Sequence, residues 1–174
     1  MPFDFYRETD TPPSDELTRQ FISRARLHLM QQYLPWLRAC LNKLSEDEIW
    51  QRPNDESNSA GNLILHLCGN IRQWIIHGVA GRPDVRDRNA EFAERGPLPK
   101  AALLARLEGT LAEVDEVLQK ITAADLSQPR QIQGFAQTVL SAIFHVVEHF
   151  SYHTGQVIYL TKMRTGEDLK FWNL

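Results

Sequence analysis

The stretch His145-Val-Val-Glu-His149-Phe-Ser-Tyr-His153-Thr-Gly-Gln156 repeats histidine at every fourth residue inside one long amphipathic segment. Because an α-helix completes a turn in about 3.6 residues, neighbouring histidines of this series project from one face, with Cβ atoms about 6 Å apart. Two neutral imidazoles at that separation can bind one metal ion. His145 and His153 lie about 12 Å apart along the helix axis, so the spacing predicts a site for one neighbouring pair and not for all three.

Another histidine, His66, lies far upstream in the apolar turn Leu63-Ile-Leu-His66-Leu67. An unpaired imidazole in an apolar interior is costly, and a metal ion would satisfy it. A pair from one helix and a single histidine from another would give a three-histidine site with an open coordination position, which is typical of catalytic metals. The alternative is that the histidines only fill core and interface positions, which is our interpretation of His28 and His77.

Composition limits the class of protein. The chain has 174 residues, of which 43% are hydrophobic and 24% charged, and we expect a single domain over residues 1–174. No apolar run approaches the ~20 residues of a membrane helix, and the first residues are too polar and acidic for a signal peptide. We therefore expect a cytoplasmic protein with no membrane partner. A net charge of −3 and the lack of a basic stripe argue against nucleic acid as a partner.

Periodic apolar residues predict an all-α fold, a four-helix bundle with long crossing loops. Ser14 is the expected cap of the first helix, and Pro35 should kink it. Cys40 and Cys68 do not form a Cys-x-x-Cys pair and are expected to be buried free thiols. The expected helices cover residues 14–44, 59–78, 100–121 and 138–164, with a flexible N-terminal arm at 1–13, a capping box at 45–48, an irregular crossing at 79–98 and a loop at 122–136.

The segment His145-Val-Val-Glu-His149 also matches the inverted zinc-peptidase motif H-x-x-E-H, in which the glutamate acts as a base. This short motif would leave His66 and His153 unexplained. Glu148 is also about 100° around the helix from its histidine neighbour, so we do not expect it to reach the site. No general base can be named from the sequence.

Two segments resemble the DinB-like superfamily, small bacterial metal-binding four-helix bundles whose relatives include YfiT-like hydrolases and thiol-dependent transferases. One is Ser57-Asn-Ser-Ala-Gly-Asn-Leu-Ile-Leu-His66-Leu-Cys-Gly-Asn70, which is similar to the helix-two segment with its single ligand histidine. The other is His149-x-x-x-His153-x-Gly155-Gln156, which is similar to the helix-four ligand pair. Together with Arg86-Asp-Arg-Asn-Ala-Glu-Phe92 in the crossing, the likeness spans most of the chain and looks closest to a branch without an assigned activity.

The resemblance implies that His66, His149 and His153 bind one divalent transition metal, zinc or nickel, with His145 a neighbour and not a ligand. It also implies helices in an up-down-down-up order, which would explain a long crossing between helices two and three. The relatives that join a low-molecular-weight thiol to an electrophile favour a transferase. A homodimer is a further expectation, which no particular residue decides.

The chemistry of three neutral imidazoles leaves the activity open. A dication at such a site would lower the pKa of bound water to about 7 for hydrolysis, or hold a small thiol as thiolate for transfer to an electrophile. The alternative is a non-catalytic metal-binding or ligand-sensing bundle. A pocket beside an open position would favour the enzyme, and a site closed by a fourth protein ligand would favour the binder.

Other side chains could support the site. Asn70 follows His66 by four residues and Gln156 follows His153 by three, so either could orient an imidazole or contact substrate, or else only meet solvent at a helix end. Arg86 and Arg88 could cover the mouth and hold an anionic substrate. We favour instead that these arginines pair with Asp84, Asp87 and Glu91 in a solvated surface loop.

Overall fold

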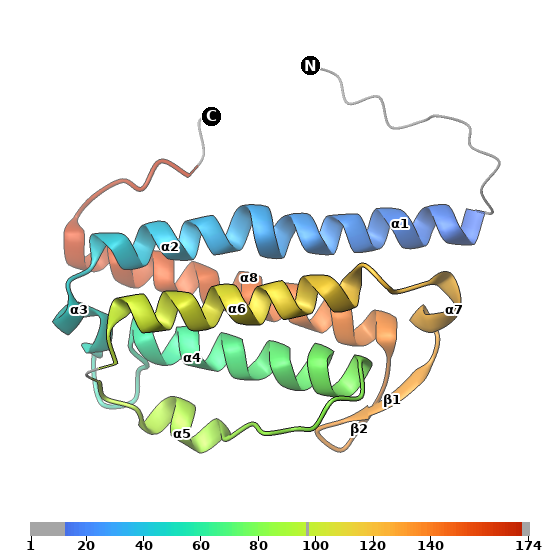
Figure 1. The fold of residues 1–174 in the computed structure, drawn as a ribbon. Helices are drawn as coiled ribbons and strands as arrows, with labels where there is room; N and C mark the ends of the chain where they lie inside the picture. The colour runs from blue at the N-terminus through green and yellow to red at the C-terminus, as the bar shows by residue number, and fades with distance from the viewer. Residues whose placement is uncertain (1–12, 97, 172–174) are drawn as a thin grey trace.

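The computed structural model describes residues 13–96 and 98–171, and its four long helical stretches surround one core (Figure 1). The first stretch joins α1 (Pro13–Arg26), the π-helical segment η1 (Leu27–Tyr33) and α2 (Leu34–Lys43). The second joins α4 (Ala60–Ile71) and the π-helical segment η2 (Arg72–Val79). The third and fourth are α6 (Lys100–Leu118) and α8 (Val139–Thr165). The predicted all-α four-helix bundle is confirmed.

The helices follow the up-down-down-up order. In Figure 1 the α1–α2 stretch and α8 run in one direction, whereas α4 and α6 run in the other. Since α4 and α6 are parallel, the chain has to return along the bundle between them. The sequence predicts an irregular crossing here, but the return segment contains a short helix, α5 (Arg88–Ala93), which Asp87 caps by accepting a hydrogen bond from the Ala90 N–H at 3.0 Å.

The central element is α4, in which every residue is buried. It packs against α5, α6 and α8, so no face of it meets solvent. Ser59 and Asn62 form a capping box at its start, where the sequence predicts a cap. The Asn62 amide also donates to the carbonyl oxygens of Glu91 and Glu94, both at 2.9 Å. These bonds fix α5 against the beginning of α4.

The first helical stretch differs in detail from the prediction. It passes through Pro35, and its irregularity is the π-helical segment η1 directly before the proline, where the Leu34 N–H bonds to the Leu29 carbonyl five residues back. A proline has no N–H and clashes with the preceding turn, so an irregular turn is expected beside it. α1 begins at Pro13, so Ser14 lies within the helix and is not its cap. The expected arm at 1–13 lies outside the described residues, apart from this proline.

The segment expected to be a loop at 122–136 contains a short helix and two strands that the sequence does not signal. These are α7 (Ala123–Leu126) and an antiparallel hairpin of β1 (Pro129–Ile132) and β2 (Phe135–Thr138). Gln133 and Gly134 make the turn with φ of 54° and 80°. Ile132 is 1% exposed and covers Gly78, where a Cβ would stand 2.5 Å from its Cδ1. The hairpin therefore closes the end of η2.

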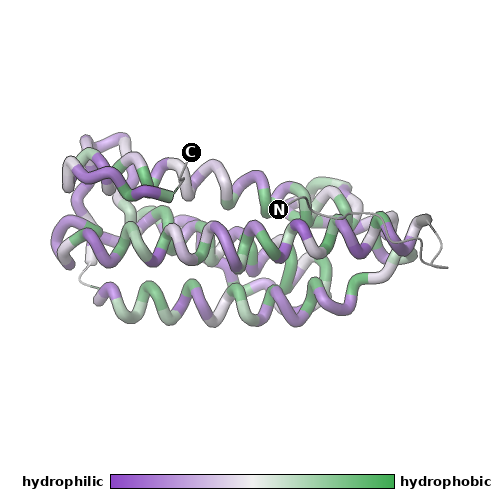
Figure 2. Tube along the Cα trace, turned by 90° about the horizontal axis from the view of Figure 1, so that it is seen from above, coloured by the Kyte–Doolittle hydropathy of each residue, from purple (hydrophilic) through white to green (hydrophobic). Residues whose placement is uncertain are grey.

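The remaining elements agree with the amphipathic pattern. The short helix α3 (Glu46–Trp50) begins at the predicted capping box of Ser45 and Glu48. Hydrophilic and hydrophobic residues alternate along the helices in Figure 2, and the apolar faces form a single core. Cys40 and Cys68 are buried free thiols within it. Among the described residues, no helix is both long and apolar enough to cross a membrane.

Candidate metal centre

His66 from α4 and His149 and His153 from α8 come together inside the bundle. One candidate ligand nitrogen from each lies within 4.8 Å of the others. The Nε2 atoms of His66 and His149 are 3.1 Å apart, close to the roughly 3.3 Å between two nitrogens on one tetrahedral zinc. The ring of His153 lies 4.5 Å from that of His149 and 4.9 Å from that of His66. The three imidazoles are thus close enough to share one ion.

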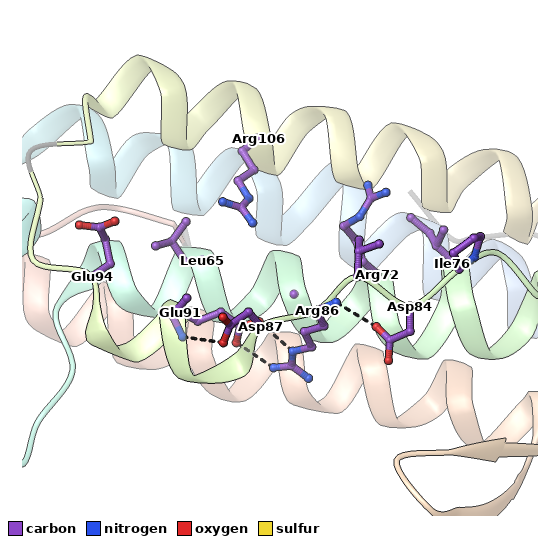
Figure 3. A pocket seen from close by; sticks show the side chains of 13 residues that line it. Leu65, Arg72, Ile76, Asp84, Arg86, Asp87, Glu91, Glu94 and Arg106 are labelled. Carbon is purple, nitrogen blue, oxygen red and sulfur yellow. Dashed lines mark hydrogen bonds and ion pairs between the residues drawn. The ribbon is translucent and has the colours of Figure 1, made fainter.

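Glu91 on α5 holds the ring of His66. Its Oε2 lies 3.0 Å from His66 Nδ1. Its carboxylate also accepts hydrogen bonds from Arg86 Nε at 2.7 Å and Arg86 Nη2 at 2.9 Å (Figure 3). Burial alone raises the pKa of Glu91, but the hydrogen bonds from Arg86 and His66 outweigh it, and the pKa falls below its usual value. An ionised carboxylate accepts the Nδ1 proton, which leaves the lone pair of His66 Nε2 directed towards the cluster.

Arg86 Nη2 also lies 3.2 Å from His66 Nδ1, so one imidazole nitrogen faces both a carboxylate and a guanidinium. A nitrogen that donates to Glu91 cannot also accept from Arg86. The carboxylate lies nearer to His66 Nδ1 than the guanidinium does and is the stronger partner. Arg86 already donates hydrogen bonds to both carboxylate oxygens of Glu91. The assignment with the proton on Nδ1 of His66 satisfies all three groups.

Burial keeps His149 and His153 neutral. His153 Nδ1 lies 2.7 Å from Gln156 Oε1 and donates to it, so Nε2 is free to bind a metal. Burial lowers the pKa of His153, and it lowers that of His149 to about 3 with help from the neighbouring histidines and Arg86. His149 Nδ1 is buried and has no hydrogen-bond partner in the described part of the chain. Neutral imidazoles are the form that metals bind, and three of them suit a divalent transition metal.

His145 and Asn70 lie beside this cluster. His145 stacks on Trp74 with ring centroids 3.9 Å apart and is not one of the three histidines with clustered nitrogens. Burial lowers its pKa, against the opposing effect of Glu148. Asn70 is 5% exposed, and its side-chain amide makes no hydrogen bond to any residue that the structure describes. Glu148 itself is exposed, as its position on the helix predicts.

The two arginines of the crossing have different positions from those expected. Arg86 pairs with Glu91, one of the predicted acidic partners, but its side chain is only 3% exposed, so the prediction of a solvated pair is wrong. The guanidinium is committed to Glu91, so it does not serve as a free anion site at the mouth. Arg88 instead lies over the Phe92 ring at 5.0 Å, and that ring packs at 4.7 Å against His66.

The roles of Glu91 and Phe92 are not evident from the sequence. Both contact His66 from α5, about 25 residues along the chain. The only signal in the sequence is indirect, because a buried histidine needs a partner for each nitrogen. The charged residues of the crossing do not indicate which acidic side chain will be buried against the bundle.

Two cavities lie beside side chains that contact the histidine cluster. One, of about 240 Å³, lies between the crossing, α4 and α6; its walls include Glu91 and Arg86, and Arg72 and Arg106 reach it from the facing helices (Figure 3). The other, of about 650 Å³, lies beside α8 and is lined by Gln156, whose amide oxygen contacts His153. Neither cavity is lined by one of the three histidines, but each reaches a side chain that contacts one of their imidazoles, Glu91 in the first and Gln156 in the second.

Comparison with known proteins gives a family and a fold. A family model described as "Protein of unknown function (DUF1572)" matches residues 16–174. No curated protein matches the chain. A DinB-like protein of Bacillus cereus ATCC 10987 superposes with a TM-score of 0.63 at 16% identity, covering 83% of this chain and 93% of its own.

Two further solved structures give the same result. The DinB-like protein YjoA of Bacillus subtilis has a TM-score of 0.61 at 18% identity, covering 86% of this chain and 93% of its own. A conserved protein of Enterococcus faecalis has a TM-score of 0.62 at 17% identity, covering 87% of this chain and 97% of its own. At these identities the likeness concerns the fold, which is DinB-like as the sequence predicts. The chain belongs to the DUF1572 family, whose function is not assigned.

Proposed function

We propose that His66, His149 and His153 hold one divalent transition metal, zinc or nickel, and that the protein is a metal-dependent enzyme acting on a small molecule. The observation that carries the proposal is the convergence of three candidate nitrogens within 4.8 Å from two different helices. Side chains hold the outer nitrogens of two of the three rings, which is the usual support of a metal-binding histidine. His145 and Asn70 are proposed neighbours of the site and not ligands.

The residues around the centre have separable roles. Glu91 keeps the proton of His66 on Nδ1 and fixes the plane of its ring, and Arg86 keeps Glu91 ionised. Gln156, a neutral acceptor, keeps the proton of His153 on Nδ1 and fixes the plane of its ring. Burial keeps His149 and His153 uncharged at neutral pH, because their pKa values lie below the ordinary value. These two imidazoles therefore present their lone pairs without having to lose protons first.

A divalent ion on three neutral imidazoles would keep its full charge and supply Lewis acidity, which activates a water for hydrolysis or favours the thiolate form of a low-molecular-weight thiol. Of these two reactions we favour thiol transfer. There the sulfur forms a bond to an electrophilic carbon, the leaving group departs with its bonding electron pair, and the thiol proton passes to solvent. We take the groove of about 650 Å³ beside Gln156 as the approach of both reactants to the site, because Gln156 contacts His153.

The alternative is a bundle that binds a metal or senses a ligand without turnover. It would use the same three histidines, and the groove would then hold a signal molecule. The large groove next to an open three-ligand set favours the enzyme. Either role requires the metal, so the first experiment is common to both.

The broader features follow the same proposal. We take residues 1–174 as one domain because the long helices share one core. A cytoplasmic location is supported by two buried free thiols. A homodimer is supported by the exposed apolar side chains of Leu140 and Phe144 near the start of α8.

Elemental analysis of the purified chain tests the proposal. We expect about one zinc or nickel ion per chain in the natural protein, loss of that ion in His149→Ala, and no change in His28→Ala, whose histidine lies outside the cluster. Loss of free thiol in the presence of an electrophile, with and without a chelator, then separates the enzyme from the binder. A chain that takes up neither metal after reconstitution would contradict both.

A further inference from the structure

The groove beside α8 has a composition that selects among small molecules. It has a volume of about 650 Å³ and lies between the loop at residues 53–58 and one face of α8. Tyr152, Tyr159 and Met163 form much of the α8 side, and their exposed fractions are 64%, 66% and 58%. Their spacing of seven and four residues places them on one face of the helix. The wall is therefore aromatic and apolar, and open to solvent.

The wall of this groove includes side chains that contact the histidine cluster. Gln156 forms part of its wall, and the same side chain contacts His153 Nδ1 at 2.7 Å. Tyr152 meets the His153 ring edge to face, with centroids 4.9 Å apart. Leu63, on the opposite wall, precedes His66 by about one turn of α4. A molecule in the groove would therefore lie against two of the three histidine-bearing turns.

The described residues that line the groove include a negative charge and no positive one. Glu56 is the one ionisable acid among the described lining residues, and none of them is lysine or arginine. The two arginines that the sequence offered as anion holders lie elsewhere, Arg86 on Glu91 and Arg88 on Phe92. An anionic ligand would find no counter-charge here. A cation would find a carboxylate and two tyrosine rings, which can attract it electrostatically.

We propose that this groove is the substrate subsite of the centre and takes a small molecule that carries an aromatic group and a protonated amine. The aromatic part packs against Tyr152 and Tyr159, and the ammonium group faces Glu56. The assignment of the occupant as substrate rests on the proposed function, since that function makes the groove the approach to the metal. The groove itself does not need the metal in order to bind.

Gly155 offers a way to fill the groove without disturbing the core. It lies in the wall, and a Cβ added there would meet nothing within 4 Å. Gly155→Leu should therefore fold, because leucine also favours the helix over glycine. Gly109 in α6 is a matched control, since a Cβ there would likewise meet nothing within 4 Å and it does not line the groove.

The experiment compares three probes of similar shape: phenethylamine, phenethyl alcohol and phenylacetate. Binding is measured on the metal-free protein and again after zinc loading, from amide chemical shifts in nitrogen–proton correlation spectra. We expect phenethylamine to bind roughly three- to fivefold more tightly than the alcohol, and phenylacetate to bind most weakly. Glu56→Gln should remove the preference for the amine, Gly155→Leu should abolish binding, and Gly109→Leu should leave it unchanged.

Several results would overturn the inference: no binding of the amine at millimolar concentration, tighter binding of the anion, or an unchanged amine affinity in Gly155→Leu. A failure of the proposed function is distinguishable. If the protein binds no metal but the amine still enters the groove with the expected preference, the subsite stands and its role as a substrate site for metal chemistry falls. If metal binds and the amine does not, only this inference is lost.

Discussion

Glu91 Oε2 lies 3.0 Å from His66 Nδ1, and both side chains are almost fully buried although they are 25 residues apart in the chain. The contact joins the return segment between the parallel helices to the central helix α4. It also places an ionised carboxylate behind a proposed metal ligand. The stability of α5 and the metal affinity of His66 therefore depend on the same carboxylate.

The first prediction concerns the loss of that charge. Glu91→Gln replaces the ionised acceptor that fixes His66 with a weaker, neutral amide and leaves the buried guanidinium of Arg86 without a counter-charge. We expect metal affinity to fall roughly ten- to a hundredfold, and the free energy of unfolding to fall by about 3–5 kcal/mol. Chelator competition measures the first effect and urea unfolding of the metal-free protein measures the second.

The double variant Arg86→Met with Glu91→Gln separates the two effects. It removes the unpaired charge, so much of the stability should return, whereas the metal affinity should stay low because His66 still lacks its carboxylate. Recovery of the affinity together with the stability would show that Glu91 acts only through the fold.

The second prediction concerns Gln156, which contacts His153 Nδ1 at 2.7 Å. Gln156→Ala removes the acceptor without leaving a buried charge, so we expect metal affinity to fall roughly tenfold with a change in stability below about 1 kcal/mol. Gln156→Glu keeps an acceptor in place and should retain the affinity. The idea fails if alanine and glutamate have the same effect on zinc competition.

Much of the bundle could be predicted because helical periodicity and capping are local signals. The boxes at Ser45 and Ser59 lie at the starts of α3 and α4, and the four long segments correspond to the four helical stretches. The hairpin could not be read in this way. Of its strand residues only Ile132 is buried, so the alternation of buried and exposed residues that marks a strand is absent. The hairpin is held by the packing of the Ile132 side chain against Gly78, which has no side chain of its own.

The candidate site was predictable to the extent that it depends on spacing within one helix. His149 and His153 are one turn apart, and the placement of His66 against them follows from packing that the resemblance implies. Glu91 was not predictable, because a charged run contains no local mark of the residue that turns inward. For the same reason Arg86 was wrongly expected at the surface: burial of a guanidinium depends on a partner that only the tertiary fold brings within reach.

The third prediction tests the close approach of α4 and the buried ion pair. A Cβ on Gly69 would stand 1.7 Å from Glu91 Oε1 and 3.0 Å from Arg86 Nε. Gly69→Ala should therefore displace the carboxylate, lower the free energy of unfolding by about 1–3 kcal/mol and weaken metal binding. Gly109→Ala, where the same methyl group meets nothing within 4 Å, should raise stability by up to about 1 kcal/mol. Thermal unfolding of the pair gives the comparison, and equal shifts in the two variants would contradict it.

The fourth prediction concerns the two free thiols. Burial raises the pKa of Cys68 to about 12 and also raises that of Cys40. The thiolate is the reactive form, so neither thiol should react with Ellman's reagent in the folded protein at pH 8, and both should react after unfolding in urea. Rapid reaction of either thiol in the native state would contradict the burial.

The raised pKa of Cys68 also makes the free energy of unfolding depend on pH in the alkaline range. In the unfolded chain the Cys68 thiol loses its proton near the ordinary cysteine pKa of 9.0, whereas in the folded chain it keeps the proton up to about 12. The folded state binds the extra proton across this window, so its stability is complete below pH 9 and falls as pH rises, by about 1.4 kcal/mol per unit. Urea unfolding at several pH values should show a shallower slope in Cys68→Ala. An identical slope in the two proteins would mean that this thiol ionises in the folded state as easily as in the unfolded chain, against its place in the core.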